Sequence, residues 1–244
     1  MDKLVFIIAQ KYYRNYPSYV QYYIDNIEKF YPESLVIVVD NNSNYKDDVF
    51  SLIKDKNNVI LLDNNIDCKF EIGAYRVAMD YMVNKNIINN YDYFIFTQDN
   101  FILKNKFDFK ILKDKNVTAC PLVSLPNDWE YWYVCDPILR KLGLNHNLRE
   151  TRLCWCSSFI LEKNNVTKML DYFKNITIID RVGSMAAERY LGKLLWELNG
   201  GNNFDIDGDV NNLDYYCHTV DAYSNINNFF CKISQQKNER TLDI

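Results

Sequence analysis

Gln98, Asp99 and Asn100 directly follow an apolar run and are the chain's first candidates for chemistry. The run, residues 91–97, is rich in aromatic and β-branched side chains, which favours a buried strand of a mostly parallel sheet. Ligands of open α/β sheets gather beyond the carboxyl ends of the strands, where polar groups can coordinate a metal or bind phosphate and sugar. The simpler interpretation is an Asp/Asn turn that closes a core strand.

Other strands are predicted to end in the same way. Four apolar runs are expected to be strands: residues 3–10, 35–40, 59–63 and 92–98. Segments with helical spacing separate them, so the first half alternates strand and helix and is typical of βαβ units on a parallel sheet. Since the carboxyl ends of such strands share one edge, we expect Asp40, Asn64 and Asp99 to form one polar site.

The second half of the chain is less regular. Strands are predicted at residues 117–123 and 153–161, on either side of a loop or edge segment rich in aromatics at 126–133. Leucines at helical spacing predict a helix over 184–199, which Gly200 and Gly201 would end.

Composition narrows the class of protein. The chain has 244 residues, 48% hydrophobic and 25% charged, as soluble globular proteins do. A net charge of -4 argues against a broad nucleic-acid surface. No apolar run reaches the ~18 residues of a membrane span, and residues 4–8 suit a first strand better than a signal segment. Seven scattered cysteines favour a reduced, cytoplasmic compartment.

Several common motifs are absent from the sequence. Ala9-Gln10-Lys11-Tyr12 follows the first strand in place of G-x-G-x-x-G, which argues against dinucleotide binding. P-loop and nucleophile-elbow motifs are also missing. Cys154-Trp155-Cys156 lacks the spacing of a zinc knuckle, and two histidines are too few for an imidazole-rich metal site.

The order of the remaining motifs resembles glycosyltransferase family 2, whose members have the GT-A fold. Residues 38–43, Val-Val-Asp-Asn-Asn-Ser, are similar to the segment whose Asp contacts the nucleotide base. Residues 64–78 resemble the helix that approaches the nucleotide sugar, and 96–100 stand where the family has its metal-binding D-x-D. The strand at 155–161 is also similar, and residues 187–191 stand where the family has its acidic base.

This resemblance implies one α/β, GT-A-like (Rossmann-like) domain over residues 1–244. Its nucleotide-sugar-binding half would be 1–104 and its acceptor-binding half 105–234. Residues 235–244 are expected to be a flexible tail, because the ends of a chain are often frayed. The implied reaction moves a sugar from a nucleotide-diphosphate sugar to a hydroxyl of a glycan or other acceptor. It would invert the anomeric centre, with Glu188 as the general base.

The resemblance also implies roles for particular residues. The nucleotide sugar is expected to contact Ala9, Gln10, Asp40, Asn64, Gly73, Arg76, Gln98 and Asp99. A divalent cation, Mn²⁺ or Mg²⁺, would be held by Asp99, Asn100 and His218. The acceptor would lie against Trp129, Trp132 and Trp155, because aromatic rings can stack on sugars.

One departure from the family pattern concerns the cation. The D-x-D position reads Gln98-Asp99-Asn100, and an amide oxygen is a weaker ligand for a hard cation than a carboxylate. Metal-independent transfer is therefore an alternative, in which Lys11, Arg76 or His218 neutralises the leaving diphosphate.

Each assignment also has a structural alternative. Asp40 suits a helix cap or Asx-turn, Glu188 a first-turn helix carboxylate, and His218 an ordinary core position. The alternatives for function are a retaining transferase, a nucleotidyltransferase, and a catalytically silent nucleotide-sugar-binding module. A nucleotidyltransferase is disfavoured because the Gly/Arg/Lys-rich segment of that class does not follow the first strand.

Overall fold

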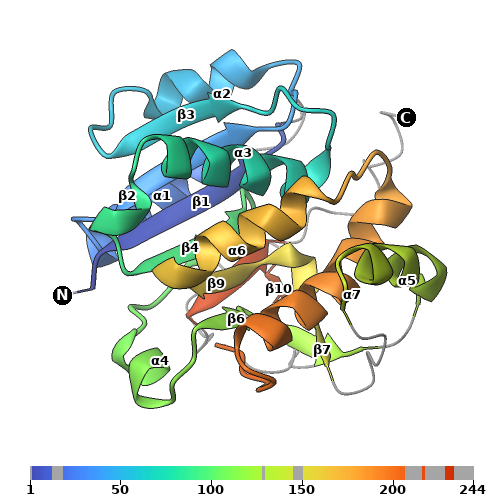
Figure 1. The fold of residues 1–244 in the computed structure, drawn as a ribbon. Coiled ribbons are helices and arrows are strands. Elements are labelled where there is room, and N and C mark those ends of the chain that lie inside the picture. The colour runs from blue at the N-terminus through green and yellow to red at the C-terminus, as the bar shows by residue number, and fades with distance from the viewer. Residues whose placement is uncertain are drawn as a thin grey trace.

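A computed structural model describes most of the chain (Figure 1). The described ranges are residues 2–12, 19–127, 130–144, 151–206, 216–217 and 229–233. Two residues with predicted roles, Trp129 and His218, lie outside these ranges, as does the predicted tail, 235–244.

A six-stranded sheet forms the centre of the fold, in the order β3-β2-β1-β4-β9-β6. Its strands are β1 Leu4–Gln10, β2 Leu35–Asp40, β3 Val59–Asp63, β4 Tyr93–Gln98, β6 Ala119–Pro121 and β9 Phe159–Glu162. The first four are mutually parallel, whereas β9 runs antiparallel to both β4 and β6. The predicted α/β class with a central, mostly parallel sheet is confirmed.

The parallel strands end at one edge of the sheet. In the strand register Gln10 lies opposite Asp40, and Asp40 lies opposite Asp63. On the other side of β1, Ala9 lies opposite Gln98. The predicted polar edge is therefore present, and it is the place where candidate site residues from four strands meet.

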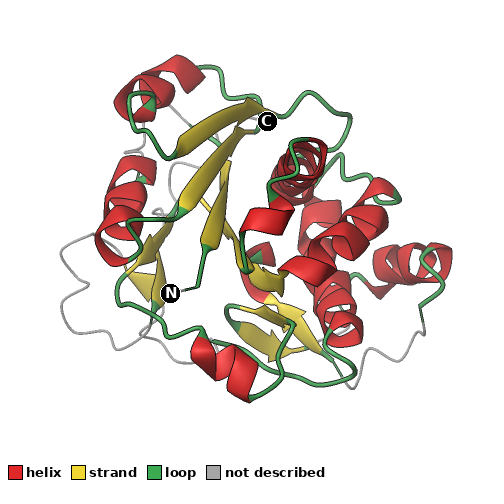
Figure 2. Cartoon of the chain, turned by 60° about the vertical axis from the view of Figure 1, so that its left-hand side comes forward, coloured by secondary structure: helices red, strands yellow, loops and turns green. Residues whose placement is uncertain are grey.

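Helices cover both faces of the sheet (Figures 1 and 2). They are α1 Val20–Phe30, α2 Lys46–Ile53, α3 Phe70–Asn84, α4 Lys110–Asp114, α5 Trp132–Lys141, α6 Lys163–Lys174 and α7 Arg181–Leu198. Residues of α3, α5, α6 and α7 form one buried cluster with one face, and residues of α1 and α2 form another cluster with the opposite face.

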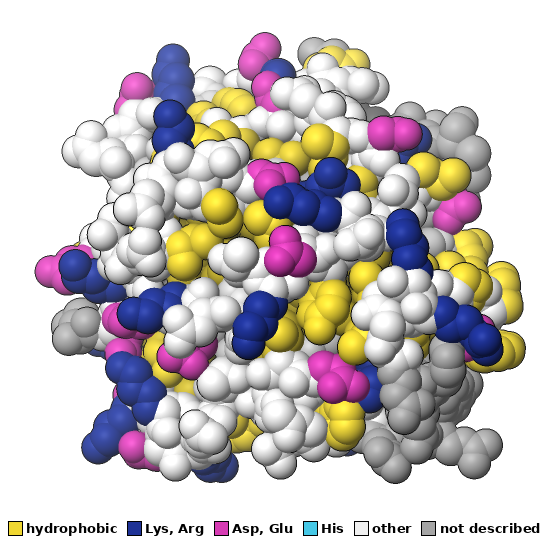
Figure 3. Space-filling model, viewed as in Figure 1, with side chains coloured by type: hydrophobic (Ala, Val, Ile, Leu, Met, Phe, Trp, Pro, Cys, Tyr) yellow, Lys and Arg dark blue, Asp and Glu magenta, His cyan; other side chains and the backbone are white. Residues whose placement is uncertain are grey.

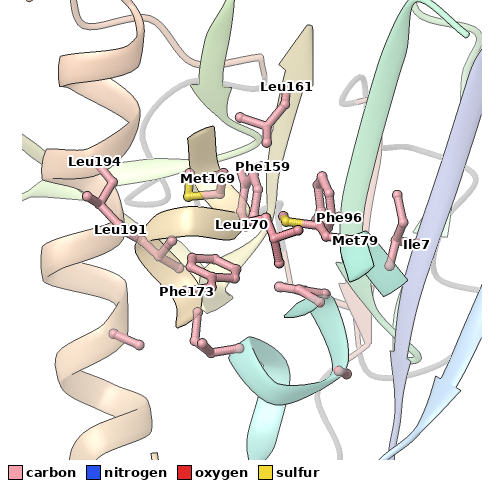
Figure 4. Packing of buried hydrophobic residues seen from close by; sticks show 14 of the residues in the cluster. Ile7, Met79, Phe96, Phe159, Leu161, Met169, Leu170, Phe173, Leu191 and Leu194 are labelled. Atoms are coloured by element: carbon pink, nitrogen blue, oxygen red, sulfur yellow. The ribbon is translucent and has the colours of Figure 1, made fainter. Parts of the chain in front are cut away.

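Aromatic rings pack together within the cluster that includes α3 and α6, and Figure 4 shows Phe96, Phe159 and Phe173 among its aliphatic side chains. Phe96 of β4 stacks on Phe159 of β9 with 4.5 Å between ring centroids, and Tyr75 of α3 meets both rings edge-on. These contacts hold α3 against the two strands whose ends lie next to the polar edge.

The second half differs from the sequence prediction. The single strand predicted at 153–161 is wrong, because β8 (Arg152–Cys154) and β9 are separated by a 3-10 turn over Trp155–Ser157. Two residues of that turn, Cys156 and Ser157, adopt left-handed φ values of 54° and 50°. Such values are uncommon without glycine and break the extended backbone.

Two further segments were not predicted correctly. The strand predicted at 117–123 is present only as the shorter β6, and β7 (Ser124–Pro126), which pairs with β8, follows the predicted range. The aromatic segment 126–133 leads into α5, and sequence periodicity did not reveal α5 or α6. The remaining strands, β5 (Phe101–Leu103), β10 (Tyr216–Cys217) and β11 (Phe230–Ile233), form a separate three-stranded sheet.

The described surface carries mixed charge. On the face shown in Figure 3, basic and acidic side chains are interspersed among apolar and neutral ones. Within the described ranges, every helix is too short or too polar to cross a lipid bilayer. The placed cysteine side chains, Cys68, Cys120, Cys135, Cys154 and Cys156, are buried, as predicted for thiols that pack as small apolar groups.

The contact between α7 and β8 depends on a glycine. A Cβ added at Gly192 would lie 1.8 Å from the backbone oxygen of Arg152, so α7 can approach β8 this closely only without a side chain there. We expect Gly192→Ala to lower the free energy of unfolding by about 1–3 kcal/mol, or more, through overpacking. Urea denaturation would measure the change.

Gly183→Ala is the matched control on the same helix. A Cβ at Gly183 would meet its nearest atoms at 3.3 Å, and alanine favours the helix, so a change within about 1 kcal/mol is expected. Equal losses of stability in the two variants would contradict the close α7–β8 contact.

Candidate active site

Gln98 is the centre of a network at the carboxyl end of β4. Its amide nitrogen donates to Glu71 Oε1 on α3 at 2.7 Å and to the backbone oxygen of Cys156 at 3.1 Å. Its amide oxygen accepts from Lys232 Nζ on β11 at 2.7 Å. One side chain thus joins a helix, the 3-10 turn and a strand from the far end of the chain.

Lys232 reaches this network from the second sheet. Strand β11 runs antiparallel to β5, with Lys232 opposite Phe101. Its ammonium also donates to Cys156 Sγ at 2.9 Å and lies 5.3 Å from the ring centroid of Trp155. The positive charge is therefore held by an amide oxygen, a sulfur and an aromatic face, a setting that stabilises a cation.

Glu188 approaches the same turn from α7. Its Oε1 accepts from the backbone N–H of Cys156 at 3.0 Å, and its Oε2 lies 3.5 Å from Arg189 Nη1. Cys156 is thus the shared contact of the site, since its N–H, C=O and Sγ face Glu188, Gln98 and Lys232 respectively.

Burial perturbs two carboxyl groups here. Desolvation raises the pKa of Glu188 from 4.5 to about 7, although the charges of Lys232 and Arg189 oppose the rise. Desolvation likewise raises the pKa of Asp99 from 3.8 to about 7, against the N–H of Lys11 and the charge of Lys232. The charge of Glu71 adds to both shifts, so Glu71 interacts electrostatically with each of these two carboxyl groups.

Asp99 also ties the site to the end of β1. Its Oδ2 accepts from the backbone N–H of Lys11 at 3.1 Å, and its own N–H donates to the oxygen of Ala9 at 3.0 Å. The Lys11 ammonium is turned to the backbone oxygens of Asn41 and Asn42, at 3.1 and 2.7 Å. The ends of β1, β2 and β4 are therefore linked directly.

Gln10 and Asp40 lie on the other side of this edge. Ile8 and Val38, two residues earlier on their strands, pack in the cluster with α1 and α2, so these side chains face that way. Asp40 is 1% exposed and accepts hydrogen bonds from the backbone N–H and hydroxyl of Ser43, as in an Asx-turn. Gln10 is fully buried, and among the described residues neither of its amide atoms has a partner.

Asn64 and Gly73 have clear packing roles. The Asn64 amide donates to Asn41 Oδ1 at 2.7 Å and to the oxygen of Cys68 at 2.8 Å. A Cβ at Gly73 would lie 1.9 Å from that same Cys68 oxygen, so glycine allows α3 to begin against the loop. Arg76, one turn further along α3, is half-buried.

The predicted acceptor tryptophans occupy different surroundings. Trp155 is 9% exposed and lies beside Lys232, within the site. Trp132 is 50% exposed at the start of α5. It follows Tyr131, whose ring centroid lies 5.2 Å from the Arg189 guanidinium carbon. Of the two predicted acceptor tryptophans that the structure describes, Trp155 is the one beside the network.

Within the described ranges, which leave out His218, the donor set does not fit the divalent cation that the resemblance implies. The described residues include no cluster of three or more His, Cys, Asp or Glu side chains arranged to hold a metal. The Gln98 oxygen already accepts from an ammonium, and Asp99 is the one carboxylate in the Gln98-Asp99-Asn100 turn. Hard cations favour several carboxylate ligands, which this turn lacks.

Sequence reasoning missed Glu71, Cys156 and Lys232. Glu71 stands in the first turn of a helix, where acidic residues are common for other reasons. Of these three residues, Lys232 carries a signal that the sequence alone could have revealed, because it is a single charge inside the otherwise apolar run 229–233. If the side chain of such a lysine is buried, its charge needs a partner.

Comparison with known proteins gives distant structural likenesses only. No family model matches the chain, and neither does any curated protein. The chain is similar to a solved structure of the mannosyltransferase PcManGT from Pyrobaculum calidifontis, which was determined in complex with GDP-Man and Mn²⁺. The TM-score is 0.43 and the sequence identity 14%, and the match covers 68% of this chain and 46% of that one.

A second solved structure, the mannosyltransferase Ktr4p from S. cerevisiae, gives a TM-score of 0.42 and 13% identity, covering 78% of this chain and 65% of that one. This chain spans less than two thirds of the length of either protein.

The raised pKa of Glu188 has a consequence for stability. The folded protein keeps this proton up to about pH 7, whereas an unfolded chain releases it near 4.5, so stability falls as pH rises through that window. The Glu188→Gln variant lacks this carboxyl group and therefore does not lose stability in that way. We expect the variant to be more stable than the wild type at pH 8 by on the order of 1–2 kcal/mol, and nearly equal to it at pH 4.5.

Urea unfolding at the two pH values measures this difference. Glu197→Gln on the same helix is the control for replacing a carboxyl group by an amide, since the Glu197 side chain is 33% exposed and lies 2.7 Å from the ammonium of the buried Lys193. A Glu188→Gln effect of the same size at both pH values would show that the carboxyl group has an ordinary pKa.

Proposed function

We propose that this chain is a glycosyltransferase that moves a sugar from a nucleotide-diphosphate sugar to an acceptor hydroxyl. One observation carries the proposal: Glu188 of α7 and Gln98 at the end of β4 converge on the same residue, Cys156. These are the two places where the resemblance to glycosyltransferase family 2 implies the catalytic base and a nucleotide-sugar contact. A likeness in sequence order and a convergence in space support the same function.

The pKa of Glu188 suits a general base. A carboxyl group with a pKa of about 7 exchanges protons readily near neutral pH. It takes the proton of the acceptor hydroxyl while that oxygen attacks the anomeric carbon. The bond from this carbon to the diphosphate oxygen breaks, and the diphosphate leaves with the electron pair. Attack from the face opposite the leaving group inverts the anomeric configuration.

The two faces of the sheet at this edge bind different parts of the nucleotide sugar. Gln10 and Asp40 face the α1 side, where a buried amide without partners among the described residues would gain hydrogen bonds from a nucleotide base. Gln98 and Asp99 face the sugar and diphosphate. Residues 1–104 then form the nucleotide-sugar half, and 105–234 the acceptor half, with Trp155 nearest the transfer site.

A catalytically silent nucleotide-sugar-binding module is the second candidate. It is favoured by the amides at Gln98 and Asn100, which replace carboxylates of the family pattern. Such a module would bind the nucleotide sugar and leave it intact.

A thermal-shift screen against nucleotide sugars, followed by an assay for transfer or hydrolysis, tests the proposal. A ligand at ~100 times its dissociation constant adds ~2.7 kcal/mol of stability, which a melting curve resolves. Binding with turnover supports the transferase, and binding without turnover supports the silent module. If no nucleotide sugar stabilises the protein, the proposed function is wrong.

Glu188→Gln should remove the base and leave the binding site in place. We expect kcat to fall by about 10²–10⁴-fold with little change in nucleotide affinity. In the wild type, kcat should rise with pH through about 7, because the base acts when deprotonated. Glu197→Gln should behave like the wild type in both assays. A Glu188→Gln variant with full activity would assign the carboxylate a purely structural role.

Asp40→Ala should weaken the binding of a nucleoside diphosphate by ~1–3 kcal/mol, the range for hydrogen bonds to charged groups. Asp63→Ala is the matched control, because Asp63 lies opposite Asp40 on the next strand and pairs with Lys46 at 2.8 Å. Titration calorimetry on folded variants would measure both. Equal affinities for Asp40→Ala and the wild type would leave Asp40 as a turn residue.

A further inference from the structure

We propose that the Lys232 ammonium is the built-in cation that neutralises the leaving diphosphate, so that transfer needs no divalent metal. This inference rests on the proposed function and names the charge that stabilises its leaving group. It begins from a disagreement: the resemblance implies a metal at the Gln98-Asp99-Asn100 turn, and the described donors do not fit one.

The Lys232 ammonium lies where the resembled family would hold its cation. Its Nζ lies 2.7 Å from Gln98 Oε1, the side-chain oxygen that stands where the resembled family has the first carboxylate of its metal motif. An ammonium in hydrogen-bond contact with this oxygen occupies the place of a bound cation. A second positive ion there would be repelled by the first.

The surroundings of the Lys232 ammonium are acidic. Glu71 contacts Gln98, and Glu188 contacts Cys156, so two carboxylates border the residues that hold the Lys232 ammonium. The charge of Lys232 also lowers the pKa of Glu188 against the larger effect of burial. The ammonium therefore acts on the proposed base from within the same network.

Other basic groups of the described chain are less suited to this role. The Lys11 ammonium is bonded to the backbone oxygens of Asn41 and Asn42. Arg76 lies on α3, where its buried Nε has no partner among the described residues, and no contact links it to Gln98. Lys232 alone among the described basic side chains donates to Gln98.

The chemistry then balances without a metal. The acceptor proton moves to Glu188, the acceptor oxygen bonds to the anomeric carbon, and the bond to the diphosphate oxygen breaks with its electron pair. Of the three N–H donors of Lys232, two are used by Gln98 and Cys156. The third can donate to the diphosphate, and a charge-assisted bond of this kind stabilises the charge that develops.

Binding of UDP, GDP and inorganic pyrophosphate, measured by calorimetry in excess EDTA and again with Mn²⁺, tests the inference. We expect at least one of the nucleoside diphosphates to bind in EDTA, with less than about a threefold change on adding Mn²⁺. Lys232→Met should weaken that binding by ~10-fold or more, and Lys232→Arg should restore much of it. Lys46→Met, which removes a lysine paired with Asp63 at the same edge, should have no effect.

Two results would overturn the proposed role of Lys232. Nucleoside-diphosphate binding that requires Mn²⁺, with turnover abolished by EDTA, would refute the role of Lys232 and leave the proposed transferase intact. Absence of binding under both conditions would refute the proposed function as well. Should Lys232→Met fail to fold, the comparison of EDTA with Mn²⁺ in the wild type and the Lys232→Arg variant still decides the question.

Discussion

The site depends on one electrostatic constraint, which is the placement of a single ammonium among partly buried carboxyl groups. Burying a carboxylate without a partner is costly, and Lys232 is the cation that reaches Gln98 and Cys156 between them. The compensation is incomplete, because burial still raises the pKa of Glu188 and Asp99 to about 7. The protein thus gives up stability at neutral pH in a place where proton exchange is useful, a compromise common at active sites.

The scaffold brings these groups together through a turn rather than through the sheet alone. The left-handed backbone of Cys156 and Ser157 costs of order 1–3 kcal/mol per residue, and the surrounding packing must hold it. In return, the three polar groups of Cys156 face Gln98, Glu188 and Lys232 at once. The close approach of α7 to β8 at Gly192, one helical turn beyond Glu188, fixes the helix against the strand that precedes this turn.

The sequence was informative where the signal is local and periodic. Apolar runs identified the four parallel strands, and the polar residues after them identified the shared edge. Glu188 could be singled out because the order of motifs resembles a known family. Lys232 could not be placed, since its position depends on β11 pairing with β5, more than a hundred residues away in the chain. The break at Cys156 is equally non-local, because its conformation is supported by contacts from α7, β4 and β11.

A carboxyl-selective ¹³C NMR titration of Glu188, in the wild type and in Lys232→Met, tests the central claim most directly. The account predicts that Glu188 titrates near pH 7 in the wild type and higher in the variant, because the ammonium that favours its charged form is gone. Titration near 4.5 that is unaffected by the loss of Lys232 would contradict the electrostatic coupling on which the site is built.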